Sequence, residues 1–488
     1  MKTNHLFNMR SNERSFCVTK MLFVMFITLY IGISPNADSK SSAMPQNEYI
    51  SSKVKSKTIM CTSTLSCRSP LVARFYTNRN YAPAWISSGQ LTQSGVSLVF
   101  AVRNSYLDGL NPYAYHVTMI NDMIGRLRHV DSRESARLLA DLDVTLTDAF
   151  FLMAEHLSNG IVPASQVSSH LTFHKKNINF IDVANKAVKA NDVAEVLGTL
   201  APRNLMYTKL KEKLYEYYKI EAAPNTQVAM QIQKIALNMD RLRILPEYMG
   251  SRYVIINIPN YSLDAYRDGK LFLTMPVVVG KPSRPSCILN GRISQVEFNP
   301  YWNVPNSIAG DEIIPELRHN PGFLRENNVR VFRNNNSMTE VNPDSIDWDS
   351  ASTSEYKFRQ DPGDGNALGK VKFAFANPCG MYLHDSLAHE LFEADARDLS
   401  HGCIRLGKPL NFAYYLLGYN KGWDKDQIMA AVNNGERRIV PLASQVDLYI
   451  LYQTLLVNSA GELIFRNDIY NLDRLSPYPV WTGVVKDN

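Results

Sequence analysis

The residues of this chain that best fit covalent chemistry surround a cysteine near the end of the sequence. Cys403 lies in the run Ser400–Leu406, and His384 precedes it by 19 positions. A thiol becomes a strong nucleophile as the thiolate, and a nearby imidazole can accept its proton. Gly402 permits a tight turn that directs the N–H groups of Gly402 and Cys403 toward one point, where they would stabilise an oxyanion. The pattern predicts a cysteine nucleophile for acyl transfer.

This set of residues resembles the signature of the YkuD-type L,D-transpeptidases. In that signature a histidine is followed at a distance by Ser/Thr-His-Gly-Cys, an apolar residue and an arginine, as in Ser400–Arg405. The resemblance implies that Cys403 is the nucleophile. It also implies that His384 is the general base and then the acid toward the leaving amine. The alternative is an ordinary buried thiol beside structural histidines.

The resemblance extends to the residues around this pair. It implies an oxyanion hole made by the N–H groups of Gly402 and Cys403 and lined by His401. Ser400 is expected to hold the turn or to contact substrate. Arg405 is expected either to bind a substrate carboxylate or to form a structural ion pair. Two aromatic residues are expected to line the site, with packing in the core as the alternative: Tyr382 and Trp302.

The substrate that the resemblance implies is peptidoglycan, whose stem peptides serve as both donor and acceptor. Cys403 would attack the carbonyl of the third stem residue, release the D-alanine that follows and form a thioester. An amine of a second stem would then complete a 3→3 cross-link. Acylation by carbapenem-type inhibitors is also implied, and no cofactor is expected. With water as acceptor the enzyme would be an L,D-carboxypeptidase, and a related variant would attach a protein to the wall or detach it.

Two hypotheses from other classes use the same residues differently. A zinc site would take His384, His389, His401 and Cys403 as ligands, but the spacing fits no zinc motif, and we expect no metal. A non-catalytic wall-binding scaffold would leave the cysteine idle, which the intact His384 and Cys403 disfavour. Trapping of the cysteine as a thioester by a carbapenem separates a scaffold from an enzyme.

Composition places the chain among globular proteins. It has 488 residues, 45% of them hydrophobic and 20% charged, which is long enough for two or three domains. The formal net charge is +6, of which the first twenty residues contribute +3, so the remainder carries only +3. This charge is too small to indicate a nucleic-acid partner.

The first 35 residues predict a targeting segment. A basic start precedes the apolar run Met21–Ile33, which has the length of a signal peptide core. We expect either a cleaved signal or an uncleaved anchor in the inner membrane, and export to the periplasm in both cases.

The chain has six cysteines. Cys17 lies in the targeting segment, so an odd number remains, which favours one reactive thiol. Cys61 with Cys67 and Cys287 with Cys379 are possible pairs that the sequence does not settle.

Helical patterns fill the region before residue 247. We expect helices over 87–110, 133–158, 181–199, 204–219 and 227–245. The runs Tyr81–Trp85 and Leu146–Phe150 resemble the N-terminal scaffold of the larger YcbB-type L,D-transpeptidases. That family commonly inserts a small peptidoglycan-binding domain after the segment matching 210–220. The chain here leaves no room for it, so how the protein is retained on the wall is an open question.

Strand patterns dominate after residue 247 and predict an α+β fold, with a helical scaffold followed by a mixed β-rich catalytic domain. The expected organisation has six parts: a targeting segment over 1–35, a flexible linker over 36–68, a helical scaffold over 69–246, a catalytic domain over 247–475, a mobile cap over the active site within it at 313–370, and a tail over 476–488. The alternative for 313–370 is a packed surface excursion. Strands are expected at 253–258, 271–280, 329–332, 337–341, 446–457 and 463–465.

Overall fold

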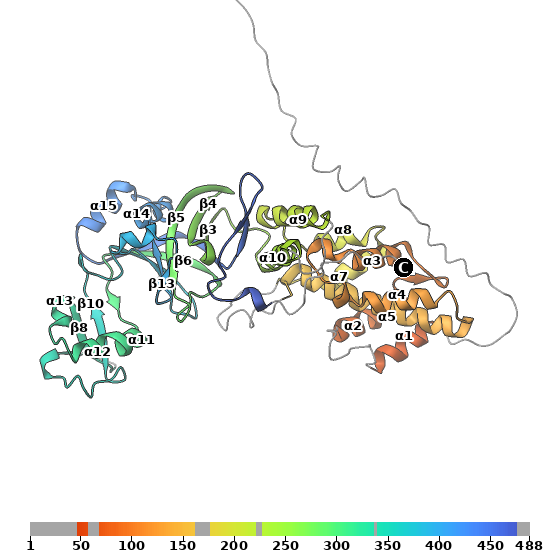
Figure 1. Ribbon diagram of the computed structural model, residues 1–488, viewed down its shortest axis with the longest axis horizontal. Coiled ribbons are helices and arrows are strands. Elements are labelled where there is room, and N and C mark those ends of the chain that lie inside the picture. The colour runs from red at the N-terminus through yellow and green to blue at the C-terminus, as the bar shows by residue number, and fades with distance from the viewer. Residues whose placement is uncertain (1–45, 57–67, 162–175, 221–226, 336–338, 476–488) are drawn as a thin grey trace, which may run out of the picture.

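The computed structural model describes residues 46–56, 68–161, 176–220, 227–335 and 339–475. The expected targeting segment, the C-terminal tail, Cys61 and Cys67 lie outside these residues. No helix within the described ranges has both the length and the apolar character needed to cross a membrane. The molecule is elongated, with helices at one end, a large sheet in the middle and a small sheet module at the other end (Figure 1).

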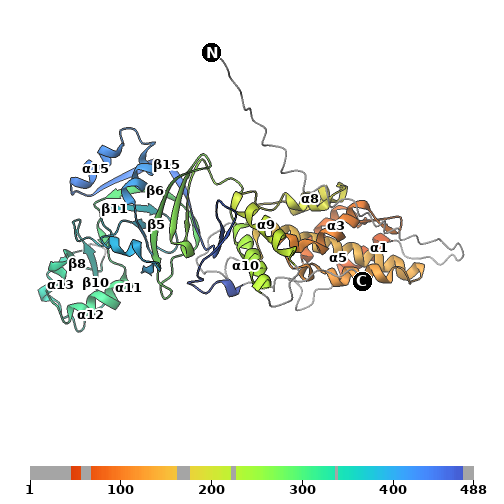
Figure 2. The same ribbon diagram turned by 45° about the horizontal axis from the view of Figure 1, so that its top comes forward.

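The helical part is organised around one long buried helix. Asp131 caps its start by accepting hydrogen bonds from the Arg133 and Glu134 N–H groups, and most side chains in its second half are buried. The other helices before residue 199 pack around it, and the last two helices of this part lie toward the sheet (Figure 2). The helices of this part are α1 (Gln46–Lys55), α2 (Ser69–Asn78), α3 (Gln93–Arg103), α4 (Val117–Arg126), α5 (Ser132–Asn159), α7 (Phe180–Lys189), α8 (Val193–Gly198), α9 (Leu205–Tyr218) and α10 (Gln227–Leu242).

Three sequence expectations are corrected here. Residues 46–55 of the expected linker form α1, because Ile50 and Val54 are buried in the helical core. The helix expected from Ser87 begins only at Gln93. Ser88 and Gly89 have positive φ and turn a short hairpin, β1 (Ile86–Ser87) and β2 (Gln90–Leu91), after which Thr92 caps α3. The single helix expected over 181–199 is two helices, since Asp192 caps a new start.

The helix α10 connects the helical part to the sheet. The Asn238 side-chain oxygen accepts the Thr454 and Leu455 N–H groups at 2.9 and 3.2 Å. Arg243 is fully buried and pairs with Asp240 at 2.8 Å. An apolar cluster, including Leu214, Ile235 and Leu455, fills the interface. The change from helices to strands falls between the end of α10 and the first long strand at Arg252.

The central sheet is mixed and closes on itself. Its order is β13-β5-β14-β12-β11-β6-β15-β3-β4, and β4 also pairs with the first half of β5. The apolar cluster it encloses is the core of this part. Its strands are β3 (Arg252–Asn257), β4 (Ser262–Arg267), β5 (Lys270–Gly280), β6 (Leu289–Phe298), β11 (Val371–Phe375), β12 (Leu383–His384), β13 (Asp398–Ser400), β14 (Ile404–Leu406) and β15 (Arg438–Leu451).

Two helices, α14 (Pro409–Leu417) and α15 (Lys425–Asn433), follow the catalytic motif, and α14 contributes Phe412 and Leu416 to the core of the sheet. The chain then enters β15, which begins earlier than the strand expected at 446. A short hairpin, β16 (Leu455–Val457) and β17 (Leu463–Phe465), matches the expected closing hairpin.

The segment expected as a loop-rich cap belongs to a small module with its own sheet and apolar core. The sheet has the order β7-β10-β8-β9, with β7 (Trp302–Asn303), β8 (Val329–Arg333), β9 (Glu340–Val341) and β10 (Tyr356–Gln360). One face is covered by short helical turns: α11 (Asn306–Ile308), Ala309–Ile313, α12 (Ile314–Leu317) and α13 (Phe323–Glu326). Leu317, Val331 and Phe358 are buried between them. We call residues 302–360 the small-sheet module.

Candidate active site

Two neighbouring strands bring His384 and Cys403 together. The strands β12 and β14 are parallel partners, with Leu383 opposite Ile404 and His384 opposite Arg405. Leu383 and Ile404 point into the core of the sheet and are fully buried. Because side chains alternate along a strand, the residues on either side of them share the other face. Tyr382, His384, Cys403 and Arg405 therefore lie on one face, which we call the catalytic face.

The Cys403 thiol contacts Tyr382 rather than a histidine. Cys403 is the one free cysteine among the described residues and is partly exposed. Burial raises its pKa, while hydrogen bonds from the Tyr382 backbone and hydroxyl, and the charges of Lys372 and Arg405, act in the opposite direction. Within the described ranges no hydrogen bond joins the sulfur to His384. The thiol is thus mostly protonated at neutral pH, and the groups around it favour the thiolate once it forms.

His384 is buried and neutral. Its Nδ1 lies 2.6 Å from the Asp385 carbonyl oxygen, which fixes the proton on Nδ1 if the ring is neutral. Burial first, and then the charge of Arg405, lower its pKa to about 3. Its ring stands 5.7 Å from the Tyr382 ring, centroid to centroid. The imidazole is therefore neutral at neutral pH.

The imidazole is oriented by backbone hydrogen bonds to Asp385 and Leu368 and not by a carboxylate. The Asp385 carboxylate instead accepts the Lys370 N–H at 2.8 Å and the Ser386 N–H at 2.7 Å. The Asp385 carboxylate packs directly against Gly369. A Cβ added at Gly369 would lie only 2.4 Å from an Asp385 carboxylate oxygen. Gly369 therefore leaves the space in which Asp385 holds the chain that follows His384.

The turn before Cys403 is held by a serine. The Ser400 hydroxyl accepts the Gly402 N–H at 3.1 Å and donates to the Cys403 carbonyl at 2.5 Å. Gly402 has a φ of +112°, a conformation that favours glycine. The Gly402 N–H is thus occupied, which corrects the expectation that it faces a substrate. The Cys403 N–H has no acceptor among the described residues, and it remains as the free donor of this turn.

The remaining expected site residues lie around the catalytic face in different roles. The Trp302 indole hydrogen-bonds to the Tyr382 hydroxyl, which in turn hydrogen-bonds to the Cys403 thiol. The Arg405 guanidinium has no carboxylate partner in the part of the chain that the structure describes, and burial lowers its pKa. The His401 Nε2 lies 2.6 Å from a carboxylate oxygen of Glu312 in the small-sheet module.

Two family models match the chain. Residues 70–214 match the model described as the Scaffold domain, and residues 251–424 match the model described as the L,D-transpeptidase catalytic domain. The second match includes both strands of the catalytic face. Residues 251–424 belong to the L,D-transpeptidase catalytic domain family. The expected combination of a helical scaffold and a β-rich L,D-transpeptidase domain is confirmed.

Individual relatives are similar to this chain to different degrees. A putative L,D-transpeptidase from Haemophilus influenzae is 28% identical over 83% of this chain and 78% of its own length. An L,D-transpeptidase from Mycobacterium smegmatis and one solved in complex with imipenem are 14% and 15% identical. Each match covers 41% of this chain, and the chain spans 58% of the length of the first structure and 59% of the second. The TM-scores are 0.21 and 0.20, respectively. At these scores the structural likeness decides nothing further.

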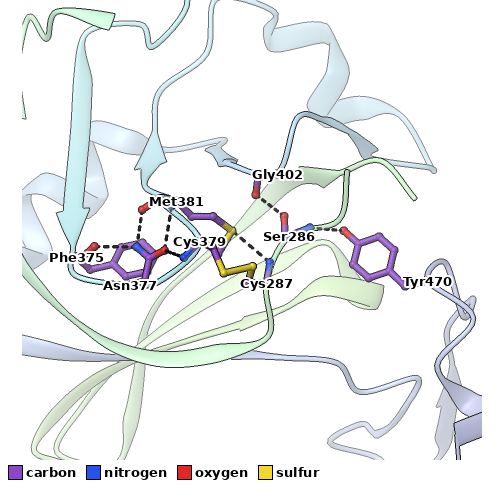
Figure 3. Close-up of a disulfide and its surroundings, with 8 residues drawn as sticks. All are labelled: Ser286, Cys287, Phe375, Asn377, Cys379, Met381, Gly402 and Tyr470. Carbon is purple, nitrogen blue, oxygen red and sulfur yellow. Dashed lines mark hydrogen bonds between the residues drawn. A yellow bond between two sulfur atoms is a disulfide. The ribbon is translucent and has the colours of Figure 1, made fainter. Parts of the chain in front are cut away.

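The structure adds two features near the catalytic face: Lys372, which the sequence did not single out, and a disulfide that the sequence left open. Lys372 of β11 lies opposite His384, 4.7 Å from the Tyr382 ring centre and 3.5 Å from the buried Glu297 carboxylate. Cys287 and Cys379 form a disulfide, one of the pairings left open above. It joins the loop between β5 and β6 to the loop that leads into β12 (Figure 3). No motif marks these residues, because sheet pairing alone brings them together.

No metal-binding cluster of His, Cys, Asp or Glu side chains occurs among the described residues. Of the four residues in the zinc hypothesis, His384 is oriented by a carbonyl and His401 by a carboxylate on another module. Their side chains are therefore directed to different places. The catalytic face itself holds a thiol, an imidazole and the cations Lys372 and Arg405.

Proposed function

We propose that this L,D-transpeptidase joins peptidoglycan stem peptides by 3→3 cross-links through a thioester on Cys403. The observation that carries the proposal is the catalytic face itself. Cys403, the one free thiol among the described residues, contacts the Tyr382 hydroxyl, interacts electrostatically with two cations and shares its face of the sheet with the neutral imidazole of His384. These are the groups that acyl transfer from an acidic peptide requires.

The first step is acylation. His384 accepts the thiol proton as the sulfur attacks the carbonyl carbon of the third stem residue. The carbonyl electron pair moves to oxygen, and the Cys403 N–H and the Tyr382 hydroxyl stand where they can donate to this oxyanion. The carbon–nitrogen bond then breaks, and His384 returns the proton to the leaving D-alanine amine.

The second step transfers the acyl group. The side-chain amine of a second stem attacks the thioester, His384 takes its proton, and the thiol is released. Stem peptides carry carboxylates, and Arg405 with Lys372 provides positive charge for them on the catalytic face. Because burial lowers the pKa of Arg405 and no carboxylate neutralises it among the described residues, its binding to a substrate carboxylate would relieve an unfavourable state.

The small-sheet module is proposed to be the cap over this face. Trp302 of β7 reaches the Tyr382 hydroxyl, and Glu312 reaches His401 of the catalytic turn. Arg284, in the loop between β5 and β6, pairs with Asp311 of the same module. These contacts hold the module beside both the nucleophile and the turn that carries it.

We propose that the protein works outside the cytoplasm. The disulfide Cys287–Cys379 supports this, since such bonds persist in oxidising compartments. The apolar run at the start of the sequence is consistent with a signal peptide or an inner-membrane anchor. A carbapenem is proposed to acylate Cys403 by the chemistry of the first step, because its strained lactam carbonyl is open to attack by the thiolate.

The test is incubation with a disaccharide tetrapeptide, with the wild type beside Cys403→Ala and a Cys403→Ser control that keeps the shape of the site. Products are separated and weighed by mass spectrometry. We expect 3→3 dimers and free D-alanine from the wild type and neither from Cys403→Ala. Tripeptide without dimers would replace the transferase by a carboxypeptidase. Wall binding without turnover in all three proteins would indicate a scaffold.

A further inference from the structure

A buried serine outside the signature contacts the catalytic turn. Ser286 lies in the loop between β5 and β6, and its side chain is 2% exposed. Its hydroxyl donates to the Gly402 carbonyl at 2.7 Å and accepts the Gly280 N–H at 2.9 Å (Figure 3). Both bonds of this hydroxyl are therefore to backbone groups, and one of those groups immediately precedes Cys403.

The bond to Gly402 sets the direction of the Cys403 N–H. The Gly402 carbonyl and the Cys403 N–H belong to the same peptide unit, which is planar and trans, so the two groups point in opposite directions. Glycine at 402 would otherwise let this peptide rotate with little steric resistance. A hydrogen bond on the carbonyl side thus fixes the N–H side, which has no acceptor among the described residues.

Ser286 is itself held from two sides. The Tyr470 hydroxyl accepts the Ser286 N–H at 3.1 Å and donates to the Gly280 carbonyl at 2.6 Å. The next residue, Cys287, forms the disulfide to Cys379, and its N–H contacts the Met381 sulfur at 3.3 Å. Figure 3 shows these groups converging on the loop from opposite directions.

We propose that Ser286 is a positioning residue that aims the Cys403 N–H at the oxyanion of acyl transfer, with Tyr470 as its support. This inference rests on the proposed function. In the step concerned, the sulfur–carbon bond forms while the carbonyl electron pair moves to oxygen, and the N–H donates to that oxygen. Collapse of the intermediate breaks the carbon–nitrogen bond, and the nitrogen takes the proton held by His384. Ser286 remains chemically unchanged.

The test compares two reactions of the same thiol. Imipenem acylates Cys403 by opening its ring at the lactam carbon–nitrogen bond, through an oxyanion. Iodoacetamide alkylates Cys403 by displacing iodide from a saturated carbon, and no oxyanion forms. For Ser286→Ala we expect the limiting rate of imipenem acylation to fall about 10- to 100-fold, with its half-saturating concentration unchanged. Alkylation should stay within about twofold of the wild type, and Ser286→Thr, which keeps the hydroxyl, should restore acylation.

An equal loss in both reactions would mean that Ser286 positions the sulfur or the fold rather than the N–H, and no loss in either would also overturn the proposal. Should Ser286→Ala fail to fold, Tyr470→Phe carries the test, with a smaller selective loss of acylation expected and the same two overturning results. A wild-type protein that iodoacetamide alkylates but imipenem does not acylate would refute the proposed function itself and the inference with it.

Discussion

The helical part and the catalytic face each contain a cluster of buried polar groups, and the two are built in opposite ways. In the helical part, the Asp143 carboxylate accepts hydrogen bonds from the Tyr76 hydroxyl and from the Ala84 and Trp85 N–H groups at 2.5 to 2.9 Å. Thr147 completes the cluster by bonding to the Trp85 indole. At the catalytic face the Cys403 N–H and the Arg405 guanidinium lack such partners among the described residues.

The difference shows that the hydrogen-bond partners of buried polar residues decide whether those residues stabilise the fold or can bind a ligand. A satisfied buried cluster fixes one arrangement of the helices and has no capacity left for a ligand. A buried polar cluster that lacks hydrogen-bond partners lowers the stability of the fold. Such a cluster is expected where a substrate supplies the missing partners. Burial lowers the pKa of two histidines alike, to about 4 for His156 and to about 3 for His384. They differ in their partners, since the His156 ring bonds to the Tyr115 hydroxyl and the His384 ring to the Asp385 carbonyl.

The largest expected difference between the two regions comes from replacing these histidines. His384→Gln should slow imipenem acylation about 10²- to 10⁴-fold, because the thiol loses its proton acceptor. The matched variant His156→Gln, which alters a contact to the Tyr115 hydroxyl in the helical part, should leave acylation unchanged. Stopped-flow absorbance of the carbapenem gives both rates. Comparable losses in the two variants would contradict the separation of roles.

The next effect is on stability. Asp143→Ala should lower the free energy of unfolding by about 3–5 kcal/mol, because it leaves two buried N–H groups and a tyrosine hydroxyl without their acceptor. Asp122→Ala is the control, since Asp122 is exposed and pairs loosely with Arg126 at 3.7 Å. Urea denaturation measures both. A loss under 1 kcal/mol for Asp143→Ala would show that the cluster is not a structural centre.

Much of this architecture could be predicted from local patterns, and the exceptions share a physical cause. The helix expected at 133–158 is α5, and the change from helix to strand occurs where expected, since both depend on apolar periodicity. The small-sheet module was expected as a loop-rich cap, because its strands are short and its core forms only on folding. The roles of Cys403 and His384 stay predictions from a motif, while Ser286, Lys372 and Tyr470 became visible only through pairing of distant segments.

The third expectation concerns pH. Because burial raises the pKa of Cys403 and keeps His384 neutral, alkylation by iodoacetamide should rise about tenfold per pH unit from pH 6 to 8. A thiolate–imidazolium pair would instead give a plateau above about pH 6.5. Rates measured across this range decide between the two, and a plateau would contradict the neutral pair.

The same histidine affects stability at low pH. The unfolded chain protonates His384 near pH 6.5, whereas the folded chain does so only near pH 3. Between these values the unfolded state binds more protons, so this group makes the folded state less stable as the pH falls. His384→Gln should therefore lose less stability than the wild type between pH 6.5 and 4, as measured by urea titrations. Parallel pH dependences would contradict the assignment.

The smallest expected effect lies between the catalytic turn and the small-sheet module. Glu312→Gln removes a partly exposed ion pair with His401, which should cost no more than about 1 kcal/mol and change acylation less than about threefold. Added salt should reduce the difference between variant and wild type. A loss similar to that of His384→Gln would place His401 in the catalytic chemistry.

The disulfide and the high pKa of the thiol have a joint consequence for the lifetime of the enzyme. The oxidising conditions under which Cys287 and Cys379 pair also expose Cys403 to oxidation, which begins from the thiolate. Burial raises the pKa of Cys403, so only a small fraction is thiolate between turnovers. The raised pKa therefore limits how readily Cys403 is oxidised to sulfenic and sulfinic acids under the conditions in which the Cys287–Cys379 disulfide forms.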